Sequence, residues 1–342
     1  MEGLMQQEQS LKKAHQLKKE HHYVWAEYLR NWAIGDIKNN VWFNKVKGGF
    51  ADGSVRMVAK ERHLYQIKPL TEDHIQIIRI LSSKSQLHKQ HMELLRKFLL
   101  VQKREELYQT SGKKSVETEK EIEAHKHNAL ENLHTAYESS VNEIISNLIN
   151  GDLSCLNDNK QLTLFCNYLG QQFARTKTFR DLACLVMSKN DSNQSKFVHR
   201  ISTECWWFIS HMLGQNFGYS IFLSRKKDNY CLLLNKTIQP FITSDNPVVN
   251  VHKNLPNDMV PPQDGQFDLY YPLSPTVAIM ISSSHRFPRG KSILTLDDVN
   301  ELNTKIAQSA YVNIFGCSKE SLKPYSKYVG DRHDRAKQFV ER

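Results

Sequence analysis

The stretch that decides the fold is Pro240-Phe241-Ile242-Thr243-Ser244-Asp245-Asn246-Pro247-Val248-Val249. Its pattern predicts a buried strand, then a turn made of hydroxyl, carboxylate and amide side chains, then a second extended segment. Asp and Asn side chains bond to their own backbone in turns, and Pro247 favours an extended conformation at Asn246. The turn alone could therefore explain this composition. Alternatively, the end of a buried strand is a place where a rigid scaffold presents polar groups to a ligand.

A second informative stretch lies far upstream, where aromatic residues recur at helical spacing. It reads His21-His22-Tyr23-Val24-Trp25-Ala26-Glu27-Tyr28-Leu29-Arg30-Asn31-Trp32-Ala33. The apolar positions from Tyr23 to Trp32 predict a short helix. The histidine pair just before this helix could shuttle protons or bind a metal, although a histidine at a helix start is more often a cap or a surface residue.

The segment between these two stretches is predicted to be a helical insert, at about residues 71–217. Of ten prolines, only Pro69 precedes residue 240, so the chain from 70 to 239 is free of the residue that breaks helices. Apolar residues three and four apart predict amphipathic helices that must bury their stripes against each other or against a sheet. These helices are expected at residues 75–81, 85–108, 130–150, 162–173 and 198–212, although Ile75-Gln76-Ile77 also alternates like a strand.

The remaining chain reads mainly as strands, with turn residues between them. Gly48-Gly49 and Asp52-Gly53 predict a hairpin near the N-terminus. Thr295 and Asp298 predict the capped start of a late helix. The predicted fold class is α+β: a mainly antiparallel sheet, built from the N-terminal hairpin and the C-terminal strands and covered by the long-helix insert. We expect a basic arm at 1–20, one domain at 21–330 and a basic tail at 331–342. The strands are expected at residues 41–43, 55–58, 219–223, 230–234, 267–271, 277–281 and 311–315.

Composition sets limits on the class of protein and on its partners. The chain has 342 residues, with 40% hydrophobic and 24% charged residues, which is typical of a globular protein. Its net charge of +10 permits a nucleic-acid partner, although a solvated basic surface explains the charge equally well. No apolar run approaches the length of a membrane span, and the first twenty residues lack a signal-peptide core. The six cysteines form no C-x-x-C pair, so we expect reduced thiols, a cytoplasmic location and no zinc site.

Four residues are the candidates for catalysis, and we expect them to converge at one cleft at the sheet edge. His22 could act as a general base, and Asp245 as a general base or, together with His22, as a ligand of a divalent metal. Arg175 could hold a phosphate, or it could form a structural ion pair with a carboxylate such as Asp245. Arg30 is the fourth candidate, with a salt bridge to the sheet as the alternative. The candidates for substrate binding are Ser244, Asn246, Gln171 and Arg180.

The two stretches resemble a widespread, mostly bacterial family catalogued only as a domain of unknown function. Its members open with an H-Y-V-P-x-x-Y-L-R-N-F-like segment and later carry P-F-x-T-S-D-N-P-V and P-L-S-P. Here His22-Tyr23-Val24, Tyr28 to Trp32, Pro240 to Val248 and Pro272 to Pro275 match. Trp25 stands where the family usually has proline, and Trp32 where it usually has phenylalanine. The resemblance implies a fold and the location of a site, but no reaction.

Two functions follow from these observations as hypotheses of different classes. The first is a hydrolase directed at nucleic acid or another phosphate compound, such as a bacterial defence or toxin nuclease. It would use Asp245 and His22 with a metal, or His22 and Arg175 without one. The second is a binding module without catalysis, with nucleic acid or a partner protein as its ligand and the polar residues as a structural network. The chain contains no G-x-G-x-x-G, P-loop, G-x-S-x-G or H-E-x-x-H motif that would name another class.

Overall fold

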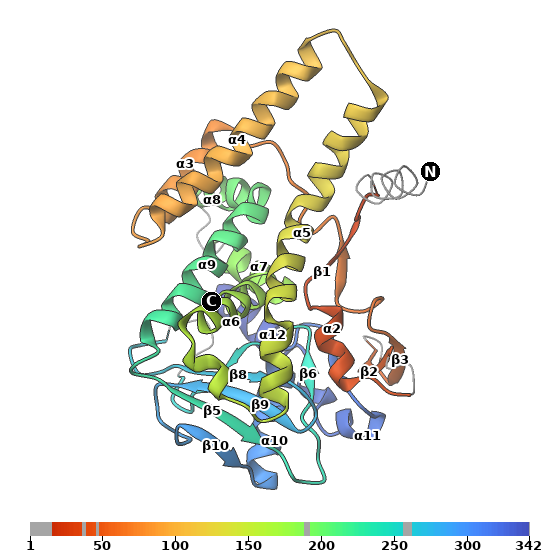
Figure 1. The fold of residues 1–342 in the computed structure, drawn as a ribbon, viewed down its shortest axis with the longest axis vertical. Helices are drawn as coiled ribbons and strands as arrows, with labels where there is room; N and C mark the ends of the chain where they lie inside the picture. Colours follow the sequence, from red (N-terminus) through yellow and green to blue (C-terminus); the bar gives the residue numbers. More distant parts are fainter. Residues whose placement is uncertain (1–15, 36–38, 46–47, 188–191, 256–261, 342) are drawn as a thin grey trace.

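A five-stranded sheet lies at the base of the molecule (Figure 1). The computed structural model describes residues 16–35, 39–45, 48–187, 192–255 and 262–341. Neighbouring strands of this sheet are antiparallel except for the outer pair β10–β5, which is parallel. The strand order is β10 (Gly290–Ile293), β5 (Asn229–Leu234), β9 (Val277–Ser282), β8 (Asp268–Pro272) and β7 (Val249–Asn250).

A second, four-stranded sheet receives the N-terminal hairpin and the decisive stretch. All its pairs are antiparallel, and β6 contains Thr243 and Ser244. The first strand of the chain, β1 (Glu20–His22), pairs separately with β4 (Lys60–Arg62). The mainly antiparallel α+β class is therefore confirmed, with the strands divided among three sheets. The order in the four-stranded sheet is β3 (Phe50–Ser54), β2 (Asn40–Asn44), β11 (Ile314–Gly316) and β6 (Thr243–Ser244).

Helices cover both faces of the five-stranded sheet, so its inner strands β5, β9 and β8 are buried on both sides, whereas the edge strand β10 is partly exposed. On one face, Leu232, Tyr271 and Ile279 pack with α5 (Val116–Ile149) and α6 (Asn159–Ala174). On the other face, Cys231, Tyr270 and Met280 pack with α10 (Leu296–Ser309). Because side chains alternate between the two faces of a strand, a strand covered on both sides must be apolar at every position. This explains the uninterrupted apolar runs of β5 and β9.

Two helices of the insert cross at very close range. The glycines Gly170 on α6 and Gly214 and Gly218 on α9 (Trp206–Ser224) lie at the crossing. A Cβ atom added to Gly170 would lie 2.2 Å from the carbonyl oxygen of Gly214, and one added to Gly218 would lie 2.6 Å from that of Cys166. Only residues without a Cβ allow the two backbones to approach this closely.

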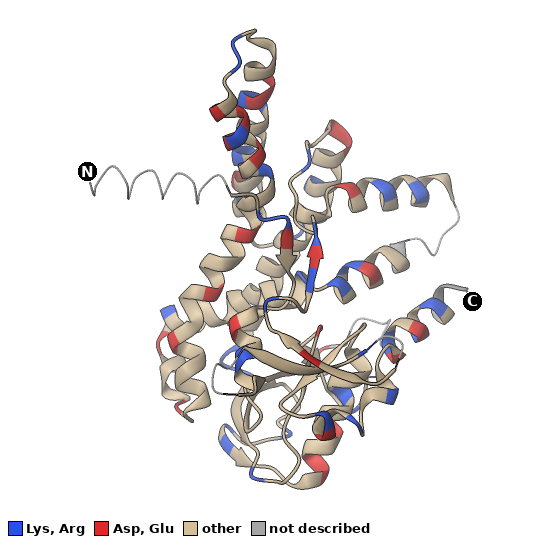
Figure 2. Ribbon diagram, turned by 90° about the vertical axis from the view of Figure 1, so that its right-hand side faces the viewer, with Lys and Arg blue, Asp and Glu red and all other residues tan. Residues whose placement is uncertain are grey.

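The insert also forms a long helical arm that projects from the sheets (Figure 1). The arm consists of α3 (Glu72–Ser82), α4 (His88–Thr110) and the first third of α5, and we use the name arm for residues 71–126. Thr71 caps α3 in a reciprocal capping box with His74. Figure 2 shows Lys and Arg interspersed with Asp and Glu along the hairpin of α4 and α5.

Several predicted elements differ from those observed. Residues 219–223 belong to α9 and not to a strand, because Gly218 serves helix packing and does not end the helix. The stripe at 198–212 divides at Cys205 into α8 (Asn193–Glu204) and α9. The second hairpin strand is Phe50–Ser54, earlier than predicted. The N-terminal segment 1–20, predicted to be a basic extension of the domain, lies mostly outside the described residues. Within the predicted tail lies α12 (Asp331–Glu341).

The remaining short elements connect these layers. No helix in the described ranges combines the length and the apolar character that crossing a bilayer requires. The short elements that connect the layers are α2 (Ala26–Leu29), η1 (Arg30–Trp32), η2 (Ser154–Asn157), α7 (Lys177–Met187), α11 (Lys319–Leu322) and η3 (Ser326–Tyr328).

Candidate functional site

Asp245 lies just after β6, and its carboxylate is bonded to the main chain. One oxygen accepts the N–H of Tyr311 at 2.8 Å; the other accepts those of Val312 at 2.7 Å and Asn313 at 2.9 Å. The side chain is buried, with the residue 2% exposed. Burial raises the pKa of Asp245 to about 6, and the bonds from the backbone amides act in the opposite direction. The carboxylate therefore fixes the segment between α10 and β11 in place.

The neighbours of Asp245 in the turn are buried and bonded in the same way. The hydroxyl of Ser244 accepts the N–H of Asn246 at 3.1 Å. The amide of Asn246 donates to the carbonyl of Ser309 at 3.2 Å, and its oxygen accepts the hydroxyl of Thr176 at 3.3 Å. This is the local turn chemistry expected of Ser, Asp and Asn, extended to a neighbouring helix.

The two informative stretches meet, as the sequence predicts, and they meet through hydrogen bonds. The Tyr28 hydroxyl donates to the carbonyl of Pro272 at 2.8 Å, so at its 2.6 Å contact with Thr243 it accepts the threonine proton. The Trp32 indole donates to the carbonyl of Phe241 at 2.8 Å, and the Asn31 amide to that of Leu273 at 2.9 Å. We call these contacts, together with those of Asp245, the motif junction. It joins α2 and η1 to both larger sheets.

Arg175, at the end of α6, forms a buried ion pair with Glu138 of α5. Its guanidinium lies 2.7 Å from the Glu138 carboxylate and donates to the side-chain oxygen of Gln172 at 2.6 Å. Burial raises the pKa of Glu138, and the positive charge of Arg175 counteracts this. The structural ion pair expected for Arg175 is therefore present, but its partner is Glu138 and not Asp245.

Gln171 precedes this ion pair by one turn and is tied to α9. Its amide donates to the backbone carbonyl of His211 at 3.0 Å, and its oxygen accepts the Nδ1 proton of the same residue at 3.0 Å. Both polar atoms of Gln171 are thus used between helices, and the side chain is 3% exposed.

The other candidates lie in separate surroundings. In His22, Nε2 contacts the carbonyl of Arg56 at 3.1 Å, and Nδ1 lies 3.8 Å from the Glu131 carboxylate. Arg30 pairs with Glu27 at 2.8 Å and donates to the side chain of Asn39 at 2.7 Å. Arg180 pairs with Glu61 and Asp181 at 2.9 and 2.8 Å. The four predicted catalytic residues, His22, Arg30, Arg175 and Asp245, therefore each interact with different groups of the protein. Asp245 accepts its hydrogen bonds from backbone N–H groups and not from His22.

A divalent metal does not fit the residues proposed for it. Both oxygens of Asp245 accept backbone N–H groups, and the imidazole of His22 faces Arg56 and Glu131. Within the described ranges, no three His, Cys, Asp or Glu side chains are grouped so that they could hold a metal ion. We derive no step through a metal.

Sequence reasoning missed the polar face of α5. Glu131, His134 and Glu138 lie three and four residues apart on the buried side of the helix, beside the apolar stripe. Burial lowers the pKa of His134 well below its ordinary value. The signal was visible in the sequence, because these polar residues follow the same helical spacing as the core residues Leu130 and Val141.

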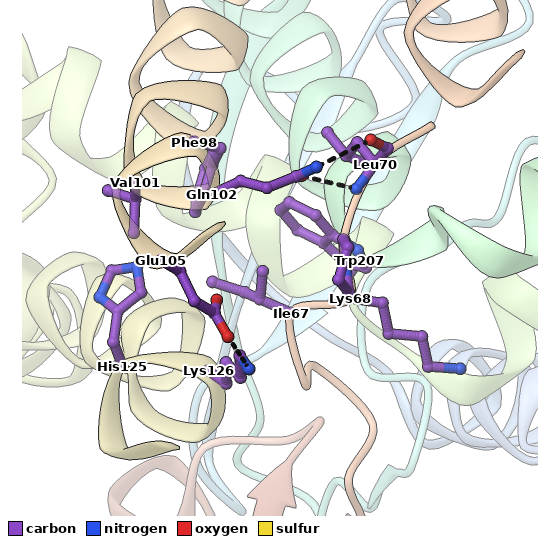
Figure 3. Close-up of a pocket in the computed structure, with 11 residues that line it drawn as sticks. Ile67, Lys68, Leu70, Phe98, Val101, Gln102, Glu105, His125, Lys126 and Trp207 are labelled. Carbon is purple, nitrogen blue, oxygen red and sulfur yellow. Dashed lines mark hydrogen bonds and ion pairs between the residues drawn. The ribbon is translucent and has the colours of Figure 1, made fainter. Parts of the chain in front are cut away.

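The hollow at the base of the arm is too small for a ligand. Its volume is about 30 Å³, roughly the space of one water molecule. Figure 3 shows how side chains close it: Gln102 of α4 bonds both backbone groups of Leu70, and Glu105 pairs with Lys126 of α5. These contacts clamp α4 and α5 to the segment that leads into the arm.

Comparison with known proteins assigns the chain to a family. A family model described as "Protein of unknown function (DUF4238)" matches residues 20–320. The chain belongs to this family. The matched residues include the motif junction and the whole arm, so both are parts of the family domain in this chain. No curated protein and no solved structure matches the chain.

Proposed function

We propose that this member of the family is a binding module without catalysis, in which the motif junction holds the scaffold that presents the arm. The observation that carries the proposal is the state of Asp245. Its carboxylate is 2% exposed and bonded to three backbone N–H groups. A general base or a metal ligand needs a lone pair that a substrate or an ion can reach, whereas this carboxylate is buried and already accepts three bonds from the protein.

The other polar residues of the candidate site support the same role. Ser244, Asn246, Gln171 and Arg175 are each at most 4% exposed and bonded to protein groups. Buried polar groups that are bonded to one another are typical of a network that fixes one arrangement of the elements around it. Such a network joins α5, α6 and α9 to the sheets here.

The surface of the arm favours a protein partner over a nucleic acid. Its charges are of both signs, with eleven Lys and Arg against nine Asp and Glu in residues 71–126, and Figure 2 shows them interspersed. A phosphate backbone is bound by clustered positive charge. The arm also carries large exposed apolar side chains, which are typical of surfaces that contact other proteins. They are Ile80, Leu81, Leu100, Val101, Leu107 and Val116.

We place the module in the cytoplasm. The six cysteines are free in the structure, and free thiols are typical of a reducing compartment.

The test of this proposal is a cleavage assay, because the hydrolase hypothesis is the alternative. Purified full-length protein is incubated with single- and double-stranded DNA and with RNA, with Mg²⁺, with Mn²⁺ and with a chelator. We expect no cleavage above the protein-free control. Cleavage that persists through a second purification and is lost in a folded Asp245→Asn variant would establish a hydrolase and overturn the proposal.

A further inference from the structure

A groove runs between α3 and α4 on the outer side of the arm. Its volume is about 740 Å³. The apolar side chains that line it are Met92, Leu95 and Leu99 of α4 and Ile80 of α3. Ile80 is 58% exposed, Met92 and Leu99 are partly buried and Leu95 is buried, so part of this apolar surface is open to solvent. Burying it against a partner would be favourable by the hydrophobic effect.

Positive charge flanks this apolar surface on both helices. Arg79 of α3 and Arg96 of α4 line the groove, together with His88 and Ser83. Arg79 forms no ion pair with any described residue. Among the residues that the structure describes, Arg96 pairs only with Glu93 on its own helix, and both side chains are about half exposed or more. Exposed pairs of this kind contribute little, so Arg96 can exchange its partner at small cost.

The groove is formed by fixed elements. The Ser82 hydroxyl lies 3.0 Å from Nδ1 of His88 and 2.9 Å from Nδ1 of His91, which ties the end of α3 to the start of α4. On the inner side, Ile78 of α3 and Leu95 of α4 pack into the core cluster that contains Trp206 and Trp207. A surface that exists before binding avoids the entropic cost of ordering it.

We propose that the groove between α3 and α4 is the docking site for an amphipathic helix of a partner protein, with an apolar stripe and acidic flanks. The inference rests on the proposed function and names its partner. Two helices with a groove between them accept a third helix, whose apolar residues at i, i+3/i+4 and i+7 would meet Ile80, Met92 and Leu99. Acidic residues beside that stripe would pair with Arg79 and Arg96.

The probe for this site is a designed peptide, labelled with fluorescein, long enough to form a helix at roughly 18 residues. It carries Leu at helical spacing and Glu on both flanks. One control peptide has the same composition in scrambled order, and a second has Lys in place of Glu. Binding to the full-length protein is measured by fluorescence anisotropy. We expect the Glu peptide to bind and each control peptide to bind at least roughly tenfold more weakly.

The variants locate the peptide on the protein. Ile80→Glu places a negative charge in the groove and should weaken binding of the Glu peptide at least roughly tenfold. Leu107→Glu is the matched control, since Leu107 is also 58% exposed on the arm but does not line the groove, and it should leave binding unchanged. Arg79→Glu combined with Arg96→Glu should reverse the preference, so that the Lys peptide binds better. The combined change Lys89→Glu and Lys103→Glu, outside the groove, should not reverse it.

The results of these measurements distinguish the possible ligands of the groove. Absence of binding, equal binding of the scrambled peptide, or equal loss in Ile80→Glu and Leu107→Glu would overturn the inference. If Ile80→Glu converts a dimer of the wild type into a monomer, the occupant is a second copy of this chain and not a partner protein. If duplex DNA competes with the peptide and its binding falls steeply with salt, the partner is a nucleic acid. Cleavage of nucleic acid in the assay described above would overturn the proposed function. Absence of peptide binding without cleavage would overturn only the inference about the groove.

Discussion

The motif junction and the arm use polar and apolar residues in opposite ways. At the junction, Tyr28, Thr243 and Asp245 are buried with their polar atoms bonded. On the arm, Ile80 and Leu107 expose apolar surface to solvent. The difference teaches that the most recognisable sequence motifs need not mark the functional surface. They can mark the place where distant segments must be held together.

The largest effect is expected from breaking the buried ion pair between α5 and α6, beside the motif junction. Arg175→Ala leaves the Glu138 carboxylate buried without its partner, which should lower the free energy of unfolding by about 3–5 kcal/mol. Urea unfolding followed by circular dichroism measures this. Replacing both residues, with Arg175→Met and Glu138→Leu, should restore most of the loss because no charge is then left unpaired. A loss in Arg175→Ala below about 1 kcal/mol would contradict the structural role.

The two regions should also respond to pH in opposite directions. Burial, with a neighbouring histidine adding to it, lowers the pKa of His91 and of His211, under the arm, to about 4. Above pH 6.5 these histidines are neutral in both the folded and the unfolded protein. As the pH falls from 6.5 towards 4, they bind a proton more readily in the unfolded protein, so the free energy of unfolding falls. Burial raises the pKa of Asp245 to about 6, so its carboxyl favours the folded state as the pH falls through 6.

The histidines dominate this balance in the range from pH 7 to pH 5. His134, whose pKa burial also lowers, acts in the same direction, so the free energy of unfolding should fall between these pH values despite the opposing effect of Asp245, as urea unfolding at both pH values would measure. His91→Asn retains a polar atom near the position of Nδ1 opposite Ser82, and it should reduce this loss by about 1–2 kcal/mol. An unchanged pH dependence in this variant would show that His91 is not responsible.

The smallest effect on stability is expected in the groove. Ile80→Glu and Leu107→Glu change exposed side chains, so each should alter the free energy of unfolding by less than about 0.5 kcal/mol. The same Ile80→Glu variant should lose peptide binding. If it unfolds the protein instead, Ile80 belongs to the core of the arm, and the contrast between the two regions is lost.

The sequence predicted the fold class because periodicity and turn chemistry are local signals, and the meeting of the two stretches followed from the hypothesis that their polar residues share one site. It failed at Gly218, since a glycine that ends a helix and one that permits a close helix crossing look alike until the partner Gly170 is placed. The partners of Asp245 were not predictable either. They are backbone N–H groups of Tyr311, Val312 and Asn313, and every residue type except proline supplies such a group.

The partner of Arg175 illustrates a different limit. Asp245 and Glu138 are equally suitable carboxylates by type, and only the packing of α5 against α6 decides between them. The sequence also did not show that His21, the neighbour of the candidate His22, is the buried histidine of this pair. His21 accepts the N–H of Tyr65 at 2.7 Å and donates to the carbonyl of Lys18, also at 2.7 Å. Adjacent residues in a strand face opposite sides, and the sequence did not show which side is inside.

The most direct test of the account is the unfolding free energy of Asp245→Ala, compared with that of Asp264→Ala. Asp264 lies exposed in a loop and serves as the matched control. We predict that Asp245→Ala lowers the free energy of unfolding by about 3 kcal/mol, because three backbone N–H groups lose their acceptor, and that Asp264→Ala changes it by less than about 0.5 kcal/mol. Equal stability of the two variants would contradict the claim that this carboxylate supports the fold.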